Sequence, residues 1–169
     1  MTSTAYILLG SNLGDREKYL SSAIAMIIDR PGLKLADSSA VYSSPAQQMK
    51  SGTPPFLNQA IKVDTALSSF DLLTALEKIE RALGRTDKGK QISRTIDLDI
   101  LLFGKEKVKT DRLTIPHPEL LNRAFALIPV IEIDPTLVHP LTNKLLRDYL
   151  NNHDVKHLRK KVENAPVSC

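Results

Sequence analysis

The sequence contains no tryptophan and a single cysteine, which is Cys169. A lone cysteine cannot form a disulfide within the chain, so a disulfide scaffold is excluded and a reducing compartment is expected. No apolar run approaches the roughly 20 residues that a membrane helix needs. The first residues also lack the basic and then apolar pattern of a secretion signal. We therefore expect a cytoplasmic protein without a membrane partner.

Several short motifs that bind phosphate or zinc are also missing. The chain has neither a G-x-x-x-x-G-K-[ST] loop nor a G-x-G-x-x-G turn. It contains no C-x-x-C or H-E-x-x-H pair, so a zinc site is not expected. If the protein binds phosphate, side chains and a metal ion must supply the contacts.

The composition is that of an ordinary globular protein. The chain has 169 residues, of which 42% are hydrophobic and 25% are charged, and this fits a single domain over 1–169. We expect a monomer. The net charge of +4 is concentrated between Lys78 and Arg94 and in a basic tail over about 152–169. Charge runs are usually solvated, so we expect the tail to be flexible.

The hydrophobic pattern predicts an alternation of strands and helices. The predicted core elements are a strand over 5–9, a helix over 15–29, strands over 33–42 and 56–65, a helix from Ser68 to Gly84, and a strand over 95–103. A short edge hairpin over 105–114, short helices within 116–135 and a last helix over 141–150 should follow. A β-α-β-β-α-β order whose middle strands are joined by a loop predicts an α+β fold. Its ferredoxin-like antiparallel sheet would carry packed helices and a C-terminal helical extension.

Two aspartates, Asp97 and Asp99, stand inside the last of these strands. Because strand side chains alternate between the two faces, both carboxylates should lie on one face. Leu98, Ile100 and Leu102 should lie on the other. Residues two apart on a strand are about 6.5–7 Å apart at Cα, so the carboxylates can converge on one ion or hold two.

Carboxylate oxygens are hard ligands that suit Mg²⁺, which often takes one or two carboxylates together with phosphate oxygens. The alternative is an exposed polar strand face that binds nothing. Two like charges among apolar neighbours repel unless something neutralises them, and Arg94 stands three residues earlier. We therefore favour a magnesium site at Asp97 and Asp99.

A second group of candidates follows shortly after the aspartates and comprises Arg112, His117 and Arg123. Arginine forks match phosphate oxygens bidentately. A lone histidine is more often structural, and at this point a phosphate site and a structural role remain equally open for the three residues.

Two further functions are compatible with this fold class. A basic ferredoxin-like module can bind nucleic acid, and a degenerate enzyme can bind nucleotide without chemistry. A nucleic-acid-binding sheet exposes aromatic side chains on its strands, whereas the strand over 95–103 carries aspartates, which repel phosphate unless a metal ion intervenes. We therefore expect small-molecule substrates and no nucleic acid.

Five segments stand in a characteristic order along the chain. They are Tyr-Ile-Leu-Leu-Gly-Ser-Asn-Leu-Gly-Asp (6–15), Phe-Leu-Asn (56–58), Arg-Thr-Ile-Asp-Leu-Asp-Ile-Leu-Leu-Phe-Gly (94–104), Arg-Leu-Thr-Ile-Pro-His-Pro (112–118) and Asn-Arg-Ala-Phe (122–125). In this order they resemble the 6-hydroxymethyl-7,8-dihydropterin pyrophosphokinase family of folate biosynthesis. The resemblance covers nearly the whole chain up to about residue 151, and the Arg-Thr-x-Asp-x-Asp and Pro-His-Pro segments are its most specific parts.

The resemblance implies transfer of a diphosphate group from ATP, the co-substrate, to the hydroxymethyl group of a reduced pterin, which leaves AMP. It implies two Mg²⁺ ions held by Asp97 and Asp99. The residues that it assigns to catalysis are Arg85, Arg94, Asp97 and Asp99. Those that it assigns to ATP are Glu80, Lys88, Arg94, Arg112, His117 and Arg123. Those that it assigns to the pterin are Ser44, Pro45, Phe56, Asn58 and Phe125.

The chain departs from the family in the loop over 85–93. Lys90-Gln91-Ile92-Ser93 stands where the family usually has Arg-Trp-Gly-Pro. A large side chain that could pin a closed loop by burial is therefore missing. We expect this loop to close on its substrates through charge.

Overall fold

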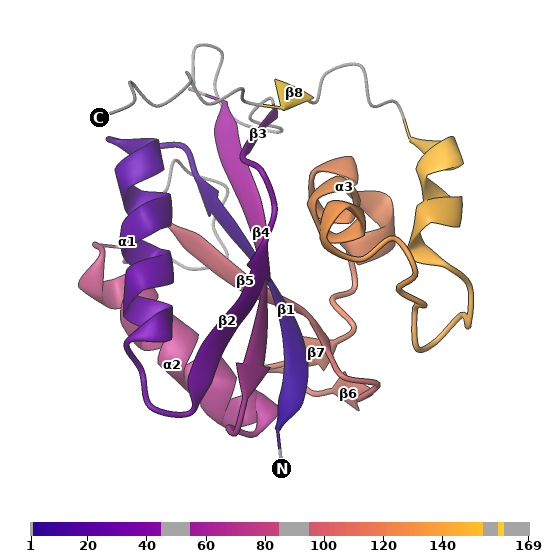
Figure 1. The fold of residues 1–169 in the computed structure, drawn as a ribbon, viewed down its shortest axis with the longest axis horizontal. Helices are drawn as coiled ribbons and strands as arrows, with labels where there is room; N and C mark the ends of the chain where they lie inside the picture. Colours follow the sequence, from indigo (N-terminus) through magenta and orange to yellow (C-terminus); the bar gives the residue numbers. More distant parts are fainter. Residues whose placement is uncertain (1, 45–54, 85–94, 154–158, 161–169) are drawn as a thin grey trace.

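The structure of the protein is a computed structural model that describes residues 2–44, 55–84, 95–153 and 159–160 (Figure 1). The described elements are, in chain order, β1 (Ser3–Ser11), α1 (Arg16–Ile28), β2 (Leu33–Ser38), β3 (Tyr42–Ser44), β4 (Phe56–Thr65), α2 (Ser69–Ala82), β5 (Asp97–Phe103), β6 (Val108–Lys109), β7 (Thr114–Ile115), the 3-10 helix η1 (Leu120–Asn122), α3 (Ala124–Ile133), the 3-10 helix η2 (Leu146–Asn152) and β8 (Arg159–Lys160).

Within the described part of the chain, six strands form one antiparallel sheet. Its order is β5-β1-β4-β3-β8, and β2 also pairs with β4. β6 and β7 form a separate two-stranded sheet. An antiparallel sheet with helices packed against it is an α+β arrangement, so the predicted fold class is confirmed.

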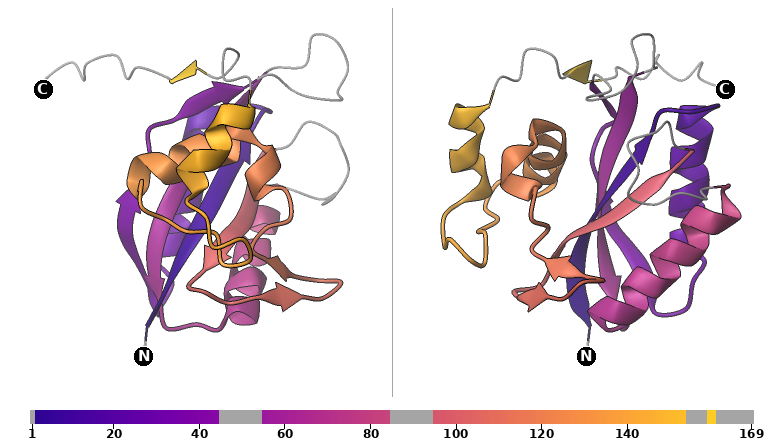
Figure 2. Two further views of the ribbon diagram at one scale, coloured as in Figure 1. Left: turned by 90° about the vertical axis from the view of Figure 1, so that its right-hand side faces the viewer. Right: turned by 180° about the vertical axis from the view of Figure 1, so that it is seen from behind.

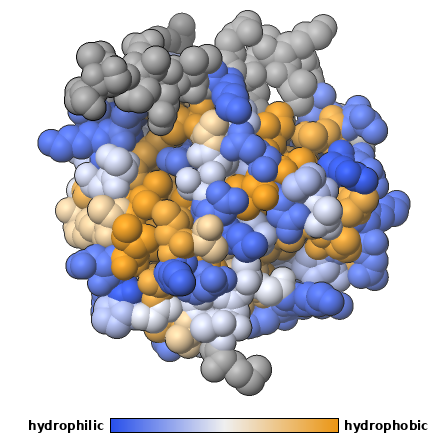
Figure 3. All heavy atoms as spheres, in the orientation of Figure 1, coloured by the Kyte–Doolittle hydropathy of each residue, from blue (hydrophilic) through white to orange (hydrophobic). Residues whose placement is uncertain are grey.

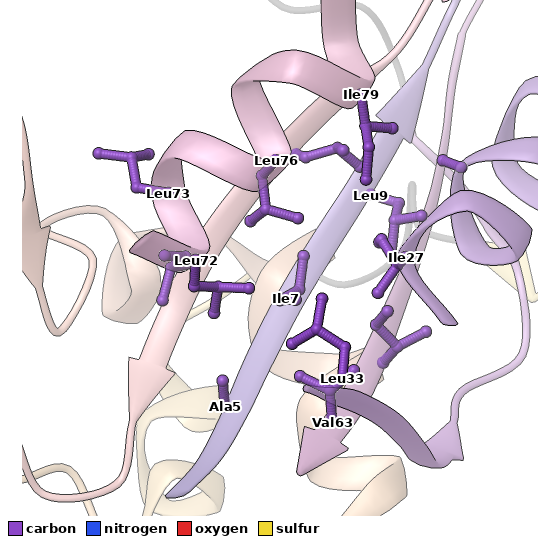
Figure 4. Close-up of a cluster of buried hydrophobic side chains, with 14 of the residues drawn as sticks. Ala5, Ile7, Leu9, Ile27, Leu33, Val63, Leu72, Leu73, Leu76 and Ile79 are labelled. Atoms are coloured by element: carbon purple, nitrogen blue, oxygen red, sulfur yellow. The ribbon is translucent and has the colours of Figure 1, made fainter. Parts of the chain in front are cut away.

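Different helices cover the two faces of the main sheet (Figures 1 and 2). α1 and α2 pack on one face, and α3 and η2 lie on the other. β1 contributes to both layers, because Ile7 and Leu9 enter the core under α1 and α2 (Figure 4), whereas Tyr6 and Leu8 enter the core under α3. A strand that is buried on both faces reads as a continuous apolar run, which is the pattern seen here.

Both helices of the first layer begin at the residues that the sequence indicates. The backbone N–H of Lys18 donates to Oδ1 of Asp15 (3.2 Å), and the N–H of Asp71 donates to Oγ of Ser68 (3.1 Å). Each side chain satisfies a donor that the first helical turn leaves without a partner. Gly84 follows α2 with a φ of +96°, a conformation that glycine adopts without steric cost.

The single strand predicted over 33–42 is wrong, because it is divided into β2 and β3. Ser39 interrupts it. Its Oγ accepts the backbone N–H of Ala60 (2.9 Å), while its own N–H donates to the Ala60 carbonyl (2.9 Å). A side chain thus replaces a backbone acceptor in the ladder, and β3 resumes opposite the first residues of β4.

The predicted alternation along β5 fails at Leu102. The register against β1 shifts so that Tyr6 is opposite Leu102 while Ile7 is opposite Ile100. Leu101 is the extra residue of this β-bulge, and an extra residue inverts the alternation beyond it. Leu102 therefore lies in the core under α3 with Leu101, not under α1 and α2.

The chain after β5 also differs in detail. The predicted hairpin forms, but as the separate β6–β7 sheet and not along the main sheet. The last helix is the 3-10 helix η2, which starts at Leu146 and not near 141. The preceding residues form a turn in which Asn143 has a φ of +59° and its N–H donates to the His139 carbonyl. Within the basic tail, residues 159–160 form β8 against β3.

The face drawn in Figure 3 mixes apolar and hydrophilic side chains. The large hydrophobic residues that are exposed among the described residues are Leu13, Ile28, Phe70, Val138 and Leu141. Scattered exposed apolar side chains are normal for a folded protein. No helix in the described ranges is long and apolar enough to span a membrane.

The cap at the start of α2 generates a stability prediction. We expect Ser68→Ala to lower the free energy of unfolding by about 1 kcal/mol, because the N–H of Asp71 loses its acceptor. Urea unfolding followed by circular dichroism measures this change. Ser68→Asp is the control, since aspartate also caps helices, and it should stay close to wild type. Equal midpoints for Ser68→Ala and wild type would contradict the role of this cap.

Candidate active site

One row of residues crosses the sheet and brings predicted site residues onto a single face. Gly10 of β1 is opposite Asp97 of β5 on one side and Asn58 of β4 on the other, and Asn58 is opposite Tyr42 of β3. Directly opposed residues of antiparallel strands point to the same face. The alternation of β1 makes this the face that α3 covers.

The two aspartates of β5 lie on this same face, as the sequence predicts. Asp97 and Asp99 are half-buried, and between and after them Leu98 and Ile100 are buried in the core under α1 and α2. No group of three or more His, Cys, Asp or Glu side chains within the described ranges could hold a metal ion. A pair of carboxylates fits Mg²⁺, which completes its shell with water and phosphate oxygens.

Glu80 supports the strand that carries the aspartates. Its side chain is on α2, is 2% exposed, and accepts the backbone N–H of Leu98 through Oε2 (2.9 Å). β5 is at the edge of the sheet, where alternate backbone N–H groups have no neighbouring strand. The Glu80 carboxylate thus binds the backbone between Asp97 and Asp99 from the opposite face.

Three predicted pterin residues lie together at the other end of the row. Phe56 is opposite Ser44 in the β3–β4 pairing, and the buried Asn58 donates from Nδ2 to Oγ of Ser44 (2.7 Å). With Nδ2 on Ser44, the amide oxygen Oδ1 is directed toward Gly10. Oδ1 lies 3.2 Å from the position that a Cβ on Gly10 would take.

Gly10 is a candidate site residue that the sequence alone did not single out. A Cβ there would also lie 3.7 Å from Cδ1 of Phe56, so a side chain would fill the space between the aspartates and the amide of Asn58. The available signal was the Gly-Ser-Asn turn directly after the first strand. In isolation such a turn is too common to indicate a site.

The start of α3 brings two predicted residues to the same face. Arg123 precedes the helix, and its guanidinium carbon lies 5.6 Å from the ring centroid of Phe125. A guanidinium at this distance over an aromatic face makes a cation–π contact. Phe125 also packs against the core under α3. The structure therefore joins an arginine expected to bind ATP with an aromatic ring expected to bind the pterin.

His117 is placed by the bulge of β5. Its backbone N–H donates to the carbonyl of Leu101 (2.9 Å), and its Nδ1 accepts the N–H of Glu119 (3.1 Å). Since Nδ1 accepts a hydrogen bond, the proton of the neutral ring resides on Nε2. The ring can therefore act as a hydrogen-bond donor through Nε2.

Arg112 is held by α2. Its guanidinium donates to Oγ1 of Thr74 (2.8 Å) and to Oε1 of Glu77 (2.6 Å), and half of its side chain is exposed. These contacts place Arg112 on the helix layer opposite α3. A phosphate group would compete with the Glu77 carboxylate for it.

Four predicted site residues lie outside the described residues. They are Arg85, Lys88 and Arg94 of the loop after α2, and Pro45 after β3. The expectation that the loop over 85–93 closes through charge falls on the same undescribed range.

Comparison with known proteins decides the family. The sequence model of the family described as 7,8-dihydro-6-hydroxymethylpterin-pyrophosphokinase matches residues 6–135. The chain belongs to this family. The match begins in β1 and ends just after α3, so it includes the whole row and the start of α3.

Curated relatives carry the same name. The pyrophosphokinase chain is 41% identical over 133 residues to the 2-amino-4-hydroxy-6-hydroxymethyldihydropteridine pyrophosphokinase of Bacillus subtilis, covering 79% of each chain. It is 36% identical over 154 residues to the protein of that name from Aquifex aeolicus, covering 91% of this chain and 94% of the relative.

Solved structures of Plasmodium falciparum HPPK-DHPS share the fold. The wild-type structure with pterin and p-hydroxybenzoate superposes with a TM-score of 0.73 at 14% identity. The match covers 95% of this pyrophosphokinase chain but 46% of the Plasmodium chain. At this identity the comparison shows the fold alone.

The position of Glu80 leads to a prediction that distinguishes two roles of its carboxylate, which are support of β5 and contact with ATP. We expect Glu80→Leu to lower the free energy of unfolding by about 1–3 kcal/mol, because the buried N–H of Leu98 loses its acceptor. Glu80→Gln keeps an acceptor oxygen and should lose less stability while retaining its affinity for ATP. Urea unfolding and calorimetric ATP titration measure both quantities. A Glu80→Gln variant with intact stability and lost ATP affinity would show that the carboxylate contacts ATP instead.

Proposed function

We infer that the chain transfers a diphosphate group from ATP to the hydroxymethyl group of 6-hydroxymethyl-7,8-dihydropterin, giving the pterin diphosphate and AMP in folate biosynthesis. The observation that carries this inference is the row of Asp97, Gly10 and Asn58 on one sheet face, in a chain of the pyrophosphokinase family. Carboxylates that suit a metal–phosphate complex are thus separated by the single strand β1 from an amide that suits a pterin edge.

The pterin binds between two aromatic rings. Phe56 stands on the sheet beside Asn58, and Phe125 comes from the start of α3, which covers the same face. A flat heterocycle stacks on such rings for about 0.5–1.5 kcal/mol each beyond its burial. The acceptor Oδ1 of Asn58, whose Nδ2 is engaged by Ser44, takes a donor from the edge of the heterocycle.

The phosphates of ATP bind cationic and donor side chains around this row. Arg123 stands at the start of α3 beside Phe125, and His117 donates through Nε2. Arginine forks bind phosphate oxygens with charge-assisted hydrogen bonds. Arg112, which is bound to Glu77 on the α2 layer, reaches a phosphate oxygen from that side by releasing Glu77. Lys88, Arg85 and Arg94 contribute from the loop after α2.

The reaction forms one bond and breaks another at the β-phosphorus. The hydroxymethyl oxygen of the pterin attacks this phosphorus, and the bond to the oxygen that bridges the α-phosphate breaks, so that AMP departs with the electron pair. The hydroxyl proton passes to a carboxylate, and we assign this role to Asp97. The protein holds the two substrates in line, and positioning of this kind supplies much of the rate enhancement in phosphoryl transfer.

Asp97 and Asp99 would hold two Mg²⁺ ions together with the phosphates. Bound there, Mg²⁺ neutralises phosphate charge and polarises the phosphorus centre. The half-buried carboxylates on one face of β5 support this assignment.

We also propose a ferredoxin-like topology, with the helices after β7 as a C-terminal extension. The strand order supports this topology. β1 lies between β4 and β5, and β2 and β3 both pair with the other edge of β4. We further propose that the protein is a monomer in the cytoplasm, where its single cysteine would stay reduced.

The function is tested by the identity of the nucleotide product. With ATP, Mg²⁺ and the pterin alcohol, we expect AMP and the pterin diphosphate in equal amounts, measured by chromatography and phosphorus NMR. Asp97→Asn and Asp99→Asn should each abolish turnover, because amides bind Mg²⁺ more weakly than carboxylates do. Asp111→Asn, in the exposed β6–β7 turn, is the matched control and should remain active. Binding of ATP and pterin without AMP release by wild type would identify a binding protein without this activity.

The aromatic pocket gives a separate prediction. We expect Phe125→Ala to weaken pterin binding by about 1–3 kcal/mol through lost burial and stacking, while ATP binding changes less. Calorimetry with each ligand measures the two affinities. Phe70→Ala removes a ring from α2, on the opposite helix layer, and serves as the control. A loss of ATP affinity with unchanged pterin affinity would contradict the assignment of Phe125.

A further inference from the structure

Glu132 connects three separate segments next to the proposed pterin pocket. It stands in the last turn of α3, where its Oε2 accepts the backbone N–H of Ala40 (2.5 Å) and its Oε1 accepts the hydroxyl of Tyr42 (2.7 Å). The ammonium of Lys160 in β8 lies 3.4 Å from the same Oε1. One carboxylate thus joins α3 to the β2–β3 connection, to β3 and to the basic tail.

The electrostatics keep this cluster in one charge state near neutral pH. Burial alone would raise the pKa of Glu132, but the hydrogen bonds from Tyr42 and Ala40 and the charge of Lys160 lower it below its ordinary value. Burial and the bond to Glu132 raise the pKa of the Tyr42 hydroxyl. The carboxylate therefore stays ionised and the phenol stays protonated, as the hydrogen bond requires.

The cluster is adjacent to the pterin residues. Tyr42 is 8% exposed and is directly opposite Asn58 in the β3–β4 pairing. Ser44, which holds the Asn58 amide, is two residues further on the same strand and so on the same face. β3 has three residues and pairs with β8 at two positions. All three residues of β3 also pair with β4, and Glu132 adds a contact that joins the strand to α3.

We propose that Glu132 is a positioning residue for the pterin pocket. By binding Ala40, Tyr42 and Lys160 it fixes β3 against α3, and so sets the separation between Ser44 and Asn58 on the sheet and Phe125 on the helix. The tail strand β8 takes part in substrate recognition through Lys160. This proposal rests on the proposed function, since it concerns how that site recognises its pterin.

The sharpest test removes one hydrogen bond and leaves the ring in place. Tyr42→Phe should raise the KM for the pterin and its directly measured Kd by about tenfold, the scale of one hydrogen bond to a charged group. The KM for ATP and kcat should stay close to wild type. Tyr149→Phe is the matched control, because Tyr149 packs at the core under α3 but takes no part in the cluster.

Further variants separate the effect of the Lys160 charge from the effect of side-chain shape. Lys160→Met should raise the pterin KM less than Tyr42→Phe does, because the Lys160 side chain is 61% exposed and exposed ion pairs are weak. Lys160→Arg should restore the wild-type value, and Lys144→Met is a control at an exposed lysine elsewhere. Glu132→Gln keeps the side-chain volume but has one acceptor oxygen in place of two and no charge, so it should raise the pterin KM as Tyr42→Phe does and provides a foldable variant of the central residue.

The outcomes distinguish this proposal from the function on which it rests. A selective rise in the pterin constants supports the positioning role. Unchanged KM and Kd for the pterin in Tyr42→Phe, or equal changes for pterin and ATP, would overturn it. AMP release by the wild type would still support the proposed function in that case. A fall in melting temperature without any change in pterin affinity would show that the cluster stabilises the fold but does not position the pterin pocket. A wild-type protein that binds no pterin would overturn both.

Discussion

The pairing register of β1 is the constraint on which the candidate site depends. β1 is bonded on both sides, and Gly10 faces Asp97 and Asn58 at the same level of the sheet. A slip of one residue against β5 would turn both carboxylates into the core under α1 and α2. The register is held because Ile7 and Leu9 fill one core while Tyr6 and Leu8 fill the other. Hydrophobic burial on two faces therefore fixes the positions of the polar side chains Asp97 and Asn58.

Two glutamates support this row from outside it. Glu80 binds the backbone of β5 from the α2 layer, and Glu132 binds β3 from the α3 layer. Burying a carboxylate such as that of Glu80 is costly unless hydrogen bonds compensate. Each of the two glutamates accepts one backbone N–H that the sheet leaves unpaired. These hydrogen bonds hold the two strands that carry the aspartates and Ser44. Such fixed geometry is what positional catalysis requires.

Much of this arrangement could be predicted from local sequence signals. The starts of the two helices at Asp15 and Ser68, the bounds of β4 and the common face of Asp97 and Asp99 all depend on neighbouring residues, and the structure confirms them. The break at Ser39 and the bulge at Leu101 could not be predicted, because each depends on pairing with a strand distant in sequence. The contact of Arg112 with α2 and the Glu132 cluster also arise from tertiary packing. The family resemblance indicated candidate residues, but it did not predict which of them are in contact.

The central claim is that both substrates meet over Gly10 on the face covered by α3. A crystal structure with Mg²⁺, a non-hydrolysable ATP analogue and the pterin alcohol tests it most directly. The account predicts the pterin ring between Phe56 and Phe125, with metal ions on Asp97 and Asp99 beside it. A pterin bound on the face that α1 and α2 cover, or metal ions away from both aspartates, would contradict the account.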